Sequence, residues 1–295
     1  MSFSKRTLAL IDQAIEEDLD AAGDLTSALL EDADAPARGR IVAREDGILA
    51  GAALAPRICE RFGRRLGATL RFEPQADDGG GLRRGQCAGT LAGPRAALLS
   101  CERVLLNFLG RLSGIATLTA RYVAAARAAN PDVCVLDTRK TTPAWRELER
   151  YAVRCGGGTN HRSGLFDAVL IKDNHLAGTP PRRLADVLRA MVARARARSP
   201  APAFIEVEVD DLRQLDAVLR VEGIDVVLLD NFPIDALREA VRLRNTRAPH
   251  VALEASGGVT LETIGPIAAT GVDRISTGAL THSARWLDLS LEMET

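Results

Sequence analysis

The second half of the chain alternates short apolar runs with amphipathic segments, and this alternation limits the possible folds more than any other feature. Six strand-like apolar runs follow Pro131, at residues 133–137, 168–172, 203–209, 226–230, 251–255 and 274–277. Amphipathic segments fill most of the intervals, at residues 143–155, 181–198, 211–222, 234–245 and 260–270. The pattern predicts parallel β-α-β units with buried strands. No Gly-x-Gly-x-x-Gly follows a strand, which favours an α/β barrel over an open doubly wound sheet.

Polar residues follow every one of these apolar runs. The six groups are Asp137-Thr138-Arg139-Lys140, Lys172-Asp173-Asn174-His175, Glu206-Val207-Glu208, Asp230-Asn231, Glu254-Ala255-Ser256-Gly257-Gly258 and Ser276-Thr277-Gly278. In α/β barrels the catalytic groups project from the carboxyl ends of the strands into one mouth, so these groups should converge. Turn chemistry explains any single group, but turns favour Gly, Asn and Ser rather than Lys and Glu.

Lysine is rare in this chain, and two of its three lysines fall at the predicted mouth. Among 38 Lys and Arg residues, only Lys5, Lys140 and Lys172 are lysines. A lysine retained where arginine meets most other needs indicates a compact ammonium group whose shape or pKa arginine cannot reproduce. Chance retention is the alternative. With Arg139 and Arg162, the two lysines predict a local site for an anion.

Two glycine-containing loops follow the last two predicted strands. Ser256-Gly257-Gly258 and Thr277-Gly278-Ala279 lie where barrels commonly bind a phosphate through backbone N–H groups. A tight turn explains either loop alone, but two consecutive loops favour phosphate binding.

Two carboxylates, Glu208 and Asp230, end neighbouring strands beside the cationic groups. Acids among cations indicate Mg²⁺ carried by a polyphosphate, and stabilisation of a developing positive charge. Structural salt bridges are the alternative. Glu206 shares the strand face of Glu208, so spacing does not decide which of the two binds.

The first part of the chain predicts a separate α+β domain at residues 1–108. It contains an amphipathic helix at 7–20, two short strands around an Asp-Gly turn within 40–51, a helix at 53–62 and strand-like runs within 67–92. A long apolar helix at 96–129, interrupted at Ser113-Gly114, should bridge to the barrel.

Composition excludes several classes of protein. A net charge of −1 argues against a broad nucleic-acid footprint. The five cysteines are odd in number and lack Cys-x-x-Cys spacing, which predicts reduced thiols in a cytoplasmic protein. The sequence has no export signal and no apolar run of membrane-spanning length, so no membrane partner is expected.

The histidines differ in their predicted roles. His161 follows Gly156-Gly157-Gly158, which either hinges a substrate loop or caps a helix. His175 is predicted to support the site by hydrogen bonding, whereas His250 and His282 are predicted to be structural. Arg103, beside Glu102, could equally be an ordinary surface pair.

Taken together, the motifs resemble those of the quinolinate phosphoribosyltransferase family, the carboxylating nicotinate-nucleotide pyrophosphorylases. The resemblance extends from about residue 16 to the C-terminus. It is carried by residues 102–117, 137–141, 156–162, 170–175, 206–209, 229–231, 254–258 and 278–283. Two departures, Ala144-Trp145-Arg146 and Ala21-Ala22, touch no expected ligand. A branch associated with molybdenum transport shares Asp-Thr-Arg-Lys-Thr, but Thr159-Asn160-His161-Arg162 resembles the biosynthetic branch.

The resemblance implies an N-terminal α/β sandwich, residues 1–108, and an incomplete, open α/β barrel of TIM type, residues 109–281, with residues 282–295 packing back on the first domain. It implies a homodimer with shared active sites, in which Arg103 comes from the partner. The substrates would be quinolinate and phosphoribosyl pyrophosphate (PRPP) with Mg²⁺. Quinolinate would be bound by Thr138, Arg139, Lys140, His161, Arg162 and Lys172. Glu208 and Asp230 would address ribose and Mg²⁺-pyrophosphate, and Ser256, Gly257, Gly258 and Gly278 the 5-phosphate.

Two other functions fit the same residues. Lys140 or Lys172 could be the nucleophile of a Schiff-base barrel lyase, because a desolvated lysine at a strand end is suited to that chemistry. A non-catalytic barrel that binds anions is the other alternative.

Overall fold

The structure is a computed structural model that describes residues 3–294. The chain forms two compact units, each assembled from separate stretches. The first comprises Met1–Ala120, Thr141–Gly157 and Leu280–Thr295, and the second comprises Arg121–Lys140 and Gly158–Ala279. Within the described residues, no helix combines the length and apolar character needed to cross a membrane.

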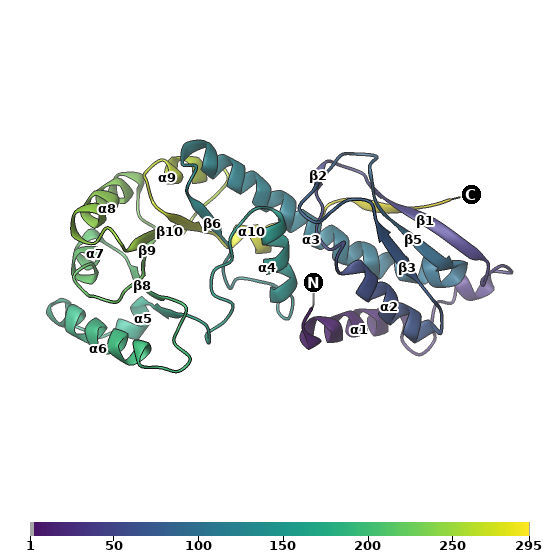
Figure 1. Ribbon diagram of the computed structural model, residues 1–295, viewed down its shortest axis with the longest axis horizontal. Coiled ribbons are helices and arrows are strands. Elements are labelled where there is room, and N and C mark those ends of the chain that lie inside the picture. Colours follow the sequence, from purple (N-terminus) through teal and green to yellow (C-terminus); the bar gives the residue numbers. More distant parts are fainter. Residues whose placement is uncertain (1–2, 295) are drawn as a thin grey trace. The chain divides into compact units, whose positions relative to one another are not determined.

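The first unit is built on a four-stranded antiparallel sheet in the order β12-β1-β5-β3 (Figure 1). A separate two-stranded sheet, β2-β4, is formed by segments that alternate with β1, β3 and β5 along the chain. The strands are β1 (Pro36–Ala43), β2 (Gly47–Ile48), β3 (Arg71–Pro74), β4 (Gly81–Leu82), β5 (Cys87–Pro94) and β12 (Leu289–Met293). The helices are α1 (Lys5–Leu19), η1 (Ser27–Leu29), α2 (Ala55–Leu66), α4 (Arg146–Cys155) and the first part of α3 (Arg95–Ala129).

The core of this unit follows from the apolar pattern of its elements. Helix α1 buries Ile11, Ile15 and Leu19, which recur at helical spacing. Strand β12 returns the C-terminus to the sheet by pairing with β1. The Asp-Gly turn does follow β1, but β1 and β2 are not a hairpin. Both edges of β1 are already occupied by β12 and β5, so β2 pairs with β4 instead.

Helix α3 runs without a break for 35 residues, so the predicted interruption at Ser113 and Gly114 is wrong. The Ser113 hydroxyl exchanges hydrogen bonds with the backbone of Ala50, accepting from its N–H at 3.0 Å. A Cβ at residue 114 would lie 1.9 Å from the carbonyl oxygen of Arg285. The small residues therefore allow close packing against a continuous helix and do not end it.

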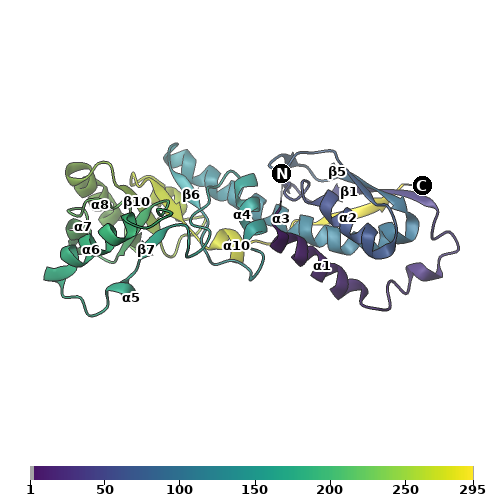
Figure 2. The same cartoon turned by 60° about the horizontal axis from the view of Figure 1, so that its bottom comes forward.

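The second unit is a six-stranded parallel sheet in the order β6-β11-β10-β9-β8-β7. All six predicted strands are confirmed, as β6 (Cys134–Leu136), β7 (Val169–Ile171), β8 (Ile205–Val209), β9 (Val226–Asp230), β10 (Ala252–Ser256) and β11 (Arg274–Ser276). Because β6 and β7 are the two edges, the barrel is open, as predicted. Helices α6 to α9 lie around the outside of the curved sheet (Figures 1 and 2). The helices are α5 (Asp173–Leu176), η2 (Pro181–Arg183), α6 (Leu184–Arg196), α7 (Leu212–Val218), α8 (Ile234–Arg247) and α9 (Ile264–Ala268). Helix α10 (Ala279–His282) begins at the last residue of this unit, and its other residues are counted in the first.

The division of the chain into compact units differs from the predicted division at residue 108. Helix α4 belongs to the first unit, although it lies between two strands of the barrel in the sequence. Its buried residue Glu149 accepts hydrogen bonds from the Arg111 guanidinium at 2.5 Å and the Thr142 hydroxyl at 2.8 Å. The buried ion pair between Glu149 and Arg111 fixes where α4 packs. The alternation of strands and helices in the sequence cannot predict such a pairing. The predicted boundary of folding domains stays a prediction.

Candidate active site

The carboxyl ends of the parallel strands bring distant segments together at one edge of the second unit. The register aligns Asp230 and Ser276 with Ser256, which lies on the strand between them. These residues line a cavity of about 480 Å³, a volume typical of small-molecule sites. The lining residues are Thr138, Arg139, Lys140, His161, Arg162, Leu170, Lys172, Glu208, Leu228, Asp230, Asn231, Glu254, Ser256, Gly257, Gly258 and Ser276.

Most of the site residues predicted from the sequence line this cavity, but four lie outside the lining set. Thr277, Gly278 and Ala279 lie just beyond it, where the buried Thr277 hydroxyl accepts the Ala279 N–H at 3.2 Å and donates to the Val259 carbonyl at 3.3 Å. Arg103 lies in the first unit on α3, exposed, with its guanidinium 4.0 Å from the Glu102 carboxylate. The ligand roles of these four residues stay predictions.

The cationic wall of the cavity comes from three separate segments. Arg139 and Lys140 follow β6, Arg162 lies in the loop before β7, and Lys172 follows β7. Burial and the nearby charge of Arg139 lower the pKa of Arg162, which indicates that the two guanidinium groups face a common space. Convergent, partly buried cations of this kind attract a dianionic ligand.

His175, which was predicted to support the site by hydrogen bonding, forms two hydrogen bonds with the backbone of Lys172. The backbone N–H of Lys172 donates to His175 Nδ1 at 2.9 Å, and the His175 N–H donates to the Lys172 carbonyl at 2.9 Å. These reciprocal bonds begin the short helix α5 and set the direction in which Lys172 leaves the strand.

The acidic side of the cavity resolves the choice between two glutamates. Glu208 lines the cavity and forms an ion pair with Lys172, whereas Glu206, two residues earlier on β8, is fully buried. Both side chains leave the same face of the strand, so their depth along it separates them. Asp230 also lines the cavity and accepts a hydrogen bond from the Asn231 amide at 2.9 Å. The two carboxylates are oxygen donors of the type that Mg²⁺ prefers.

The Ser256–Gly258 loop has a backbone that only glycine accommodates easily. Gly257 and Gly258 have φ angles of +94° and +59°. A Cβ on Gly257 would lie 2.2 Å from the Asn231 Oδ1 atom, whereas a Cβ on Gly258 would meet nothing within 4 Å. The Asn231 N–H donates to the Ser256 carbonyl at 2.9 Å, which ties the loop to the end of β9. Such a turn exposes backbone N–H groups to an anion.

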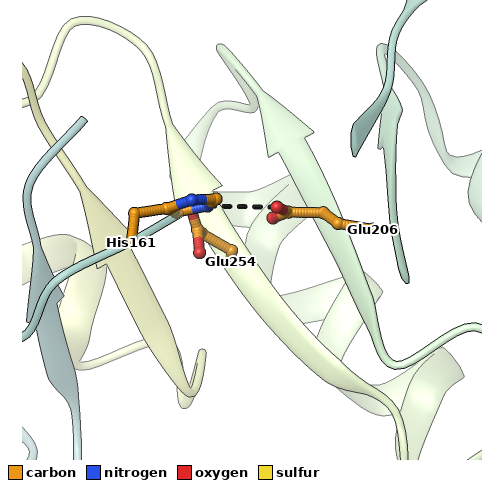
Figure 3. A group of neighbouring side chains, drawn as sticks. All are labelled: His161, Glu206 and Glu254. Carbon is orange, nitrogen blue, oxygen red and sulfur yellow. Dashed lines mark ion pairs between the residues drawn. The ribbon is translucent and has the colours of Figure 1, made fainter. Parts of the chain in front are cut away.

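At the base of the cavity lies a cluster of buried and partly buried charged residues that the sequence did not predict, formed by His161, Glu206, Glu254 and Arg274. His161 Nε2 lies 3.0 Å from Glu206 Oε2 and 3.3 Å from Glu254 Oε1. Figure 3 shows the two glutamates reaching the imidazole from separate strands. Arg274 Nε donates to the second oxygen of Glu254 at 2.8 Å. A charged residue inside the apolar run around Glu254 was the available signal, because unpaired carboxylates are rarely buried.

The cluster changes the proton affinity of its members. Burial alone lowers the pKa of His161, but hydrogen bonds to Glu206 and Glu254 and their negative charge raise its pKa to about 9. Burial and the charge of Glu254 raise the pKa of Glu206. The backbone N–H of Arg162 donates to His161 Nδ1 at 2.7 Å. His161 and Glu206 therefore share one proton beyond the one that a neutral imidazole already carries.

Asp137 anchors the loop that carries His161 and Arg162. This fully buried carboxylate accepts the His161 backbone N–H at 2.8 Å on one oxygen and the Asn160 amide at 2.6 Å on the other. It follows the last residue of β6 and directly precedes Thr138. Asp137 thus connects two of the three segments of the cationic wall, a role that the sequence motif alone did not reveal.

An open parallel α/β barrel with a cationic wall, two carboxylates and a glycine turn at its strand ends defines an enzyme of phosphorylated or otherwise anionic substrates. The sequence profile of the Quinolinate phosphoribosyl transferase C-terminal domain matches residues 115–292, and that of the N-terminal domain matches residues 24–113. The chain belongs to the quinolinate phosphoribosyltransferase family.

Known relatives resemble the chain over almost its whole length. It is 42% identical to the nicotinate-nucleotide pyrophosphorylase [carboxylating] of Mycobacterium leprae, over 96% of this chain and 95% of that protein. It is 41% identical to a probable enzyme of the same name from Bacillus subtilis, over 96% and 92%. The crystal structure of NadC from Streptococcus pyogenes superposes with a TM-score of 0.86 at 34% identity, covering 100% of this chain and 99% of that one.

Proposed function

We propose that the protein transfers the phosphoribosyl group of PRPP to quinolinate and releases carbon dioxide, giving nicotinate mononucleotide and pyrophosphate. The observation that carries this proposal is one cavity that combines a cationic wall with a glycine turn at neighbouring strand ends. The wall suits the two carboxylates of quinolinate, and the turn suits the 5-phosphate of PRPP. Membership of the family supports the same substrates.

In the first step, the ring nitrogen of quinolinate attacks C1 of PRPP and pyrophosphate leaves. The transition state has oxocarbenium character, and Glu208 and Asp230 stabilise its positive charge from the cavity wall. These carboxylates are also the residues that would bind Mg²⁺ carried by PRPP, and that ion would neutralise charge on the departing pyrophosphate. Arg139, Arg162 and Lys172 position the ring for attack.

In the second step, the bond between C2 and the 2-carboxylate breaks and carbon dioxide departs, and the electron pair stays on C2, where the positive charge of the quaternised ring nitrogen stabilises it. The resulting carbanion at C2 takes a proton to complete nicotinate mononucleotide. Lys140 and Lys172 are the candidate donors, because both line the cavity and an ammonium group carries three protons. A single turnover in deuterated solvent should place deuterium at C2, and unlabelled product would contradict a solvent-exchanging donor.

The decisive test of function is product analysis with quinolinate, nicotinate and PRPP, offered separately and together. We expect pyrophosphate and carbon dioxide in equal amounts, only when quinolinate and PRPP are both present. Use of nicotinate without quinolinate would move the chain to a different phosphoribosyltransferase. Borohydride trapping of a carbonyl substrate would favour the Schiff-base lyase. Ligand binding without pyrophosphate release would favour the non-catalytic barrel.

We further propose a homodimer in which Arg103 of one subunit completes the site of the other. Arg103 is exposed and belongs to the first unit, while the cavity is built from the second, which is compatible with donation to a second copy. Mixing Arg103→Ala protein with Lys172→Ala protein should restore part of the activity, because one mixed site keeps both residues. Absence of recovery after verified subunit exchange would indicate self-contained sites.

We place the protein in the cytoplasm, where its substrates are small, charged metabolites. The five cysteines are free, which agrees with a reducing compartment. Small-molecule substrates and a second copy of the chain are the only partners we propose.

A further inference from the structure

The cluster at the base of the cavity brings two carboxylates, an imidazole and a guanidinium together. Glu206 on β8 and Glu254 on β10 are both fully buried, and β9 lies between these two strands. Each carboxylate approaches the same imidazole nitrogen of His161. Replacing buried ion pairs by apolar residues is often neutral or stabilising, so a buried network of this kind is weak evidence for a purely structural role. Its members are instead candidates for a role in the site above them.

A metal ion is one occupant that this group could accept, since the three ligand atoms lie within 4.8 Å of one another. The charge balance argues against it. The two carboxylates are offset by the Arg274 guanidinium, which is 2.8 Å from Glu254, and by the one additional proton that His161 and Glu206 share beyond that of neutral imidazole. The cluster is therefore neutral without an added cation, and a divalent ion would leave a buried excess of positive charge.

The cluster is connected to the cavity through His161. His161 and Glu254 line the cavity, whereas Glu206 lies behind them. The imidazole in turn accepts the backbone N–H of Arg162 at 2.7 Å, and Arg162 belongs to the cationic wall. Orientation of the ring by the two glutamates therefore sets the position of the loop from which Arg162 reaches the ligand.

We propose that Glu206, Glu254 and Arg274 are positioning residues of the quinolinate site, which act by holding the His161 ring and the Arg162 loop at the carboxylate-binding wall. This inference rests on the proposed function, and it adds residues that bind no substrate themselves. Glu208 and Asp230, on the sugar-phosphate side, are not held by this cluster. Loss of the cluster should therefore weaken binding of the dicarboxylate and leave binding of PRPP nearly unchanged.

The test compares Glu206→Gln and Glu254→Gln with Asp273→Asn in the full-length protein. Asp273 directly precedes β11 and accepts a hydrogen bond from the Arg244 guanidinium at 2.7 Å, and it does not line the cavity, so Asp273→Asn removes a charge at the amino end of the sheet. We expect each Gln variant to raise the KM for quinolinate about tenfold or more, because loss of a residue that orients a ligand-binding side chain typically has an effect of this size. The KM for PRPP should change less than about twofold in all three variants.

A double-mutant cycle separates positioning through His161 from general destabilisation. If Glu206 acts through the imidazole, Glu206→Gln should change quinolinate affinity little in a His161→Asn background, so the two effects will be strongly non-additive. Calorimetry with quinolinate in the absence of PRPP measures that affinity without turnover. Additive effects, or equal losses for quinolinate and PRPP, would overturn the proposal. So would a stoichiometric metal ion in the purified protein whose removal reproduces the Gln phenotype.

Failure of this inference is distinguishable from failure of the proposed function. Wild-type turnover of quinolinate and PRPP tests the function, and calorimetric binding of quinolinate tests the positioning role without reference to turnover. Wild-type protein that binds no quinolinate would overturn both. Thermal melting of each variant checks folding, and Glu254→Asp provides a second, charge-conserving variant. It should melt like Glu254→Gln but retain more quinolinate affinity, and equal loss in both would count against the proposal.

Discussion

The two ends of the parallel sheet carry charged residues in different arrangements. At the amino ends, Asp225 and Asp273 each precede a strand and accept a backbone N–H near the start of the neighbouring strand, from Ile205 at 2.6 Å and Leu253 at 2.7 Å. Each also pairs with an arginine from a helix, Arg196 at 2.6 Å or Arg244 at 2.7 Å. These repeated contacts satisfy backbone donors and join helices to the sheet.

At the carboxyl ends the charges converge on a cavity instead. Cations from three segments face the same space, and the pKa of Arg162 is lowered by burial and by Arg139. Like charges brought together oppose folding unless a ligand compensates for them. The difference teaches that one end of the sheet is organised for stability and the other for binding an anion, in agreement with the general rule for α/β barrels.

The largest expected effect is loss of activity at the carboxyl end. Lys172→Ala removes an ammonium group from the cavity wall and leaves the Glu208 carboxylate without its ion pair. We expect kcat/KM for quinolinate to fall by about 10²- to 10³-fold, the usual effect of removing a single charge-stabilising group. Lys140→Ala should also abolish turnover. Near-normal steady-state rates in both variants would contradict the assignment of the cavity as the active site.

The next effect distinguishes two adjacent glycines. Gly257→Ala should raise the KM for PRPP about 100-fold, because the new Cβ would lie 2.2 Å from Asn231 in a backbone with φ of +94°. Gly258→Ala is the matched control, since its φ is +59° but its Cβ meets no atom within 4 Å. We expect a change several times smaller there. Equal effects in initial-rate assays would show that the loop does not depend on the contact with Asn231.

A third experiment tests the charge of the buried cluster through pH. The pKa of His161 is raised to about 9 in the folded protein from 6.5. The stability that it contributes is therefore fully present below pH 6.5, and it is lost as the pH rises through about 9. The full shift corresponds to an upper limit of about 3 kcal/mol at 1.36 kcal/mol for each pKa unit.

Denaturant unfolding at pH 6 and pH 9.5 measures this loss in wild type and in His161→Gln. The variant should show a smaller decrease in unfolding free energy over that interval. The same decrease in both proteins would mean that the titrating group lies elsewhere.

The smallest effect belongs to the amino end. Asp273→Asn should lower the unfolding free energy by about 1–2 kcal/mol, because it weakens hydrogen bonds to a charged guanidinium and to a strand N–H. Steady-state constants for both substrates should stay within about twofold of wild type, since the change is at the stabilising end of the sheet. A selective change in quinolinate KM would show that the two ends are energetically coupled.

The sequence by itself determined the strands of the second unit and most of the cavity wall. Continuous apolar runs fix which segments are buried, and the carboxyl ends of parallel strands necessarily share one edge, so Lys172, Asp230 and Ser256 could be placed together before any coordinates were known. The rare lysines and the glycine loop can also be identified from the sequence, because their chemistry depends on single residues.

Tertiary structure alone decided the features that depend on depth and on partners. Glu206 and Glu208 share a strand face, and only the packed structure shows that one is buried against His161 and the other is at the cavity. Helix α3 continues through Gly114, and α4 belongs to the first unit. Both features likewise depend on neighbours that are distant in the sequence. Local propensity reports which residues prefer burial, but it cannot report which buried charge meets which partner.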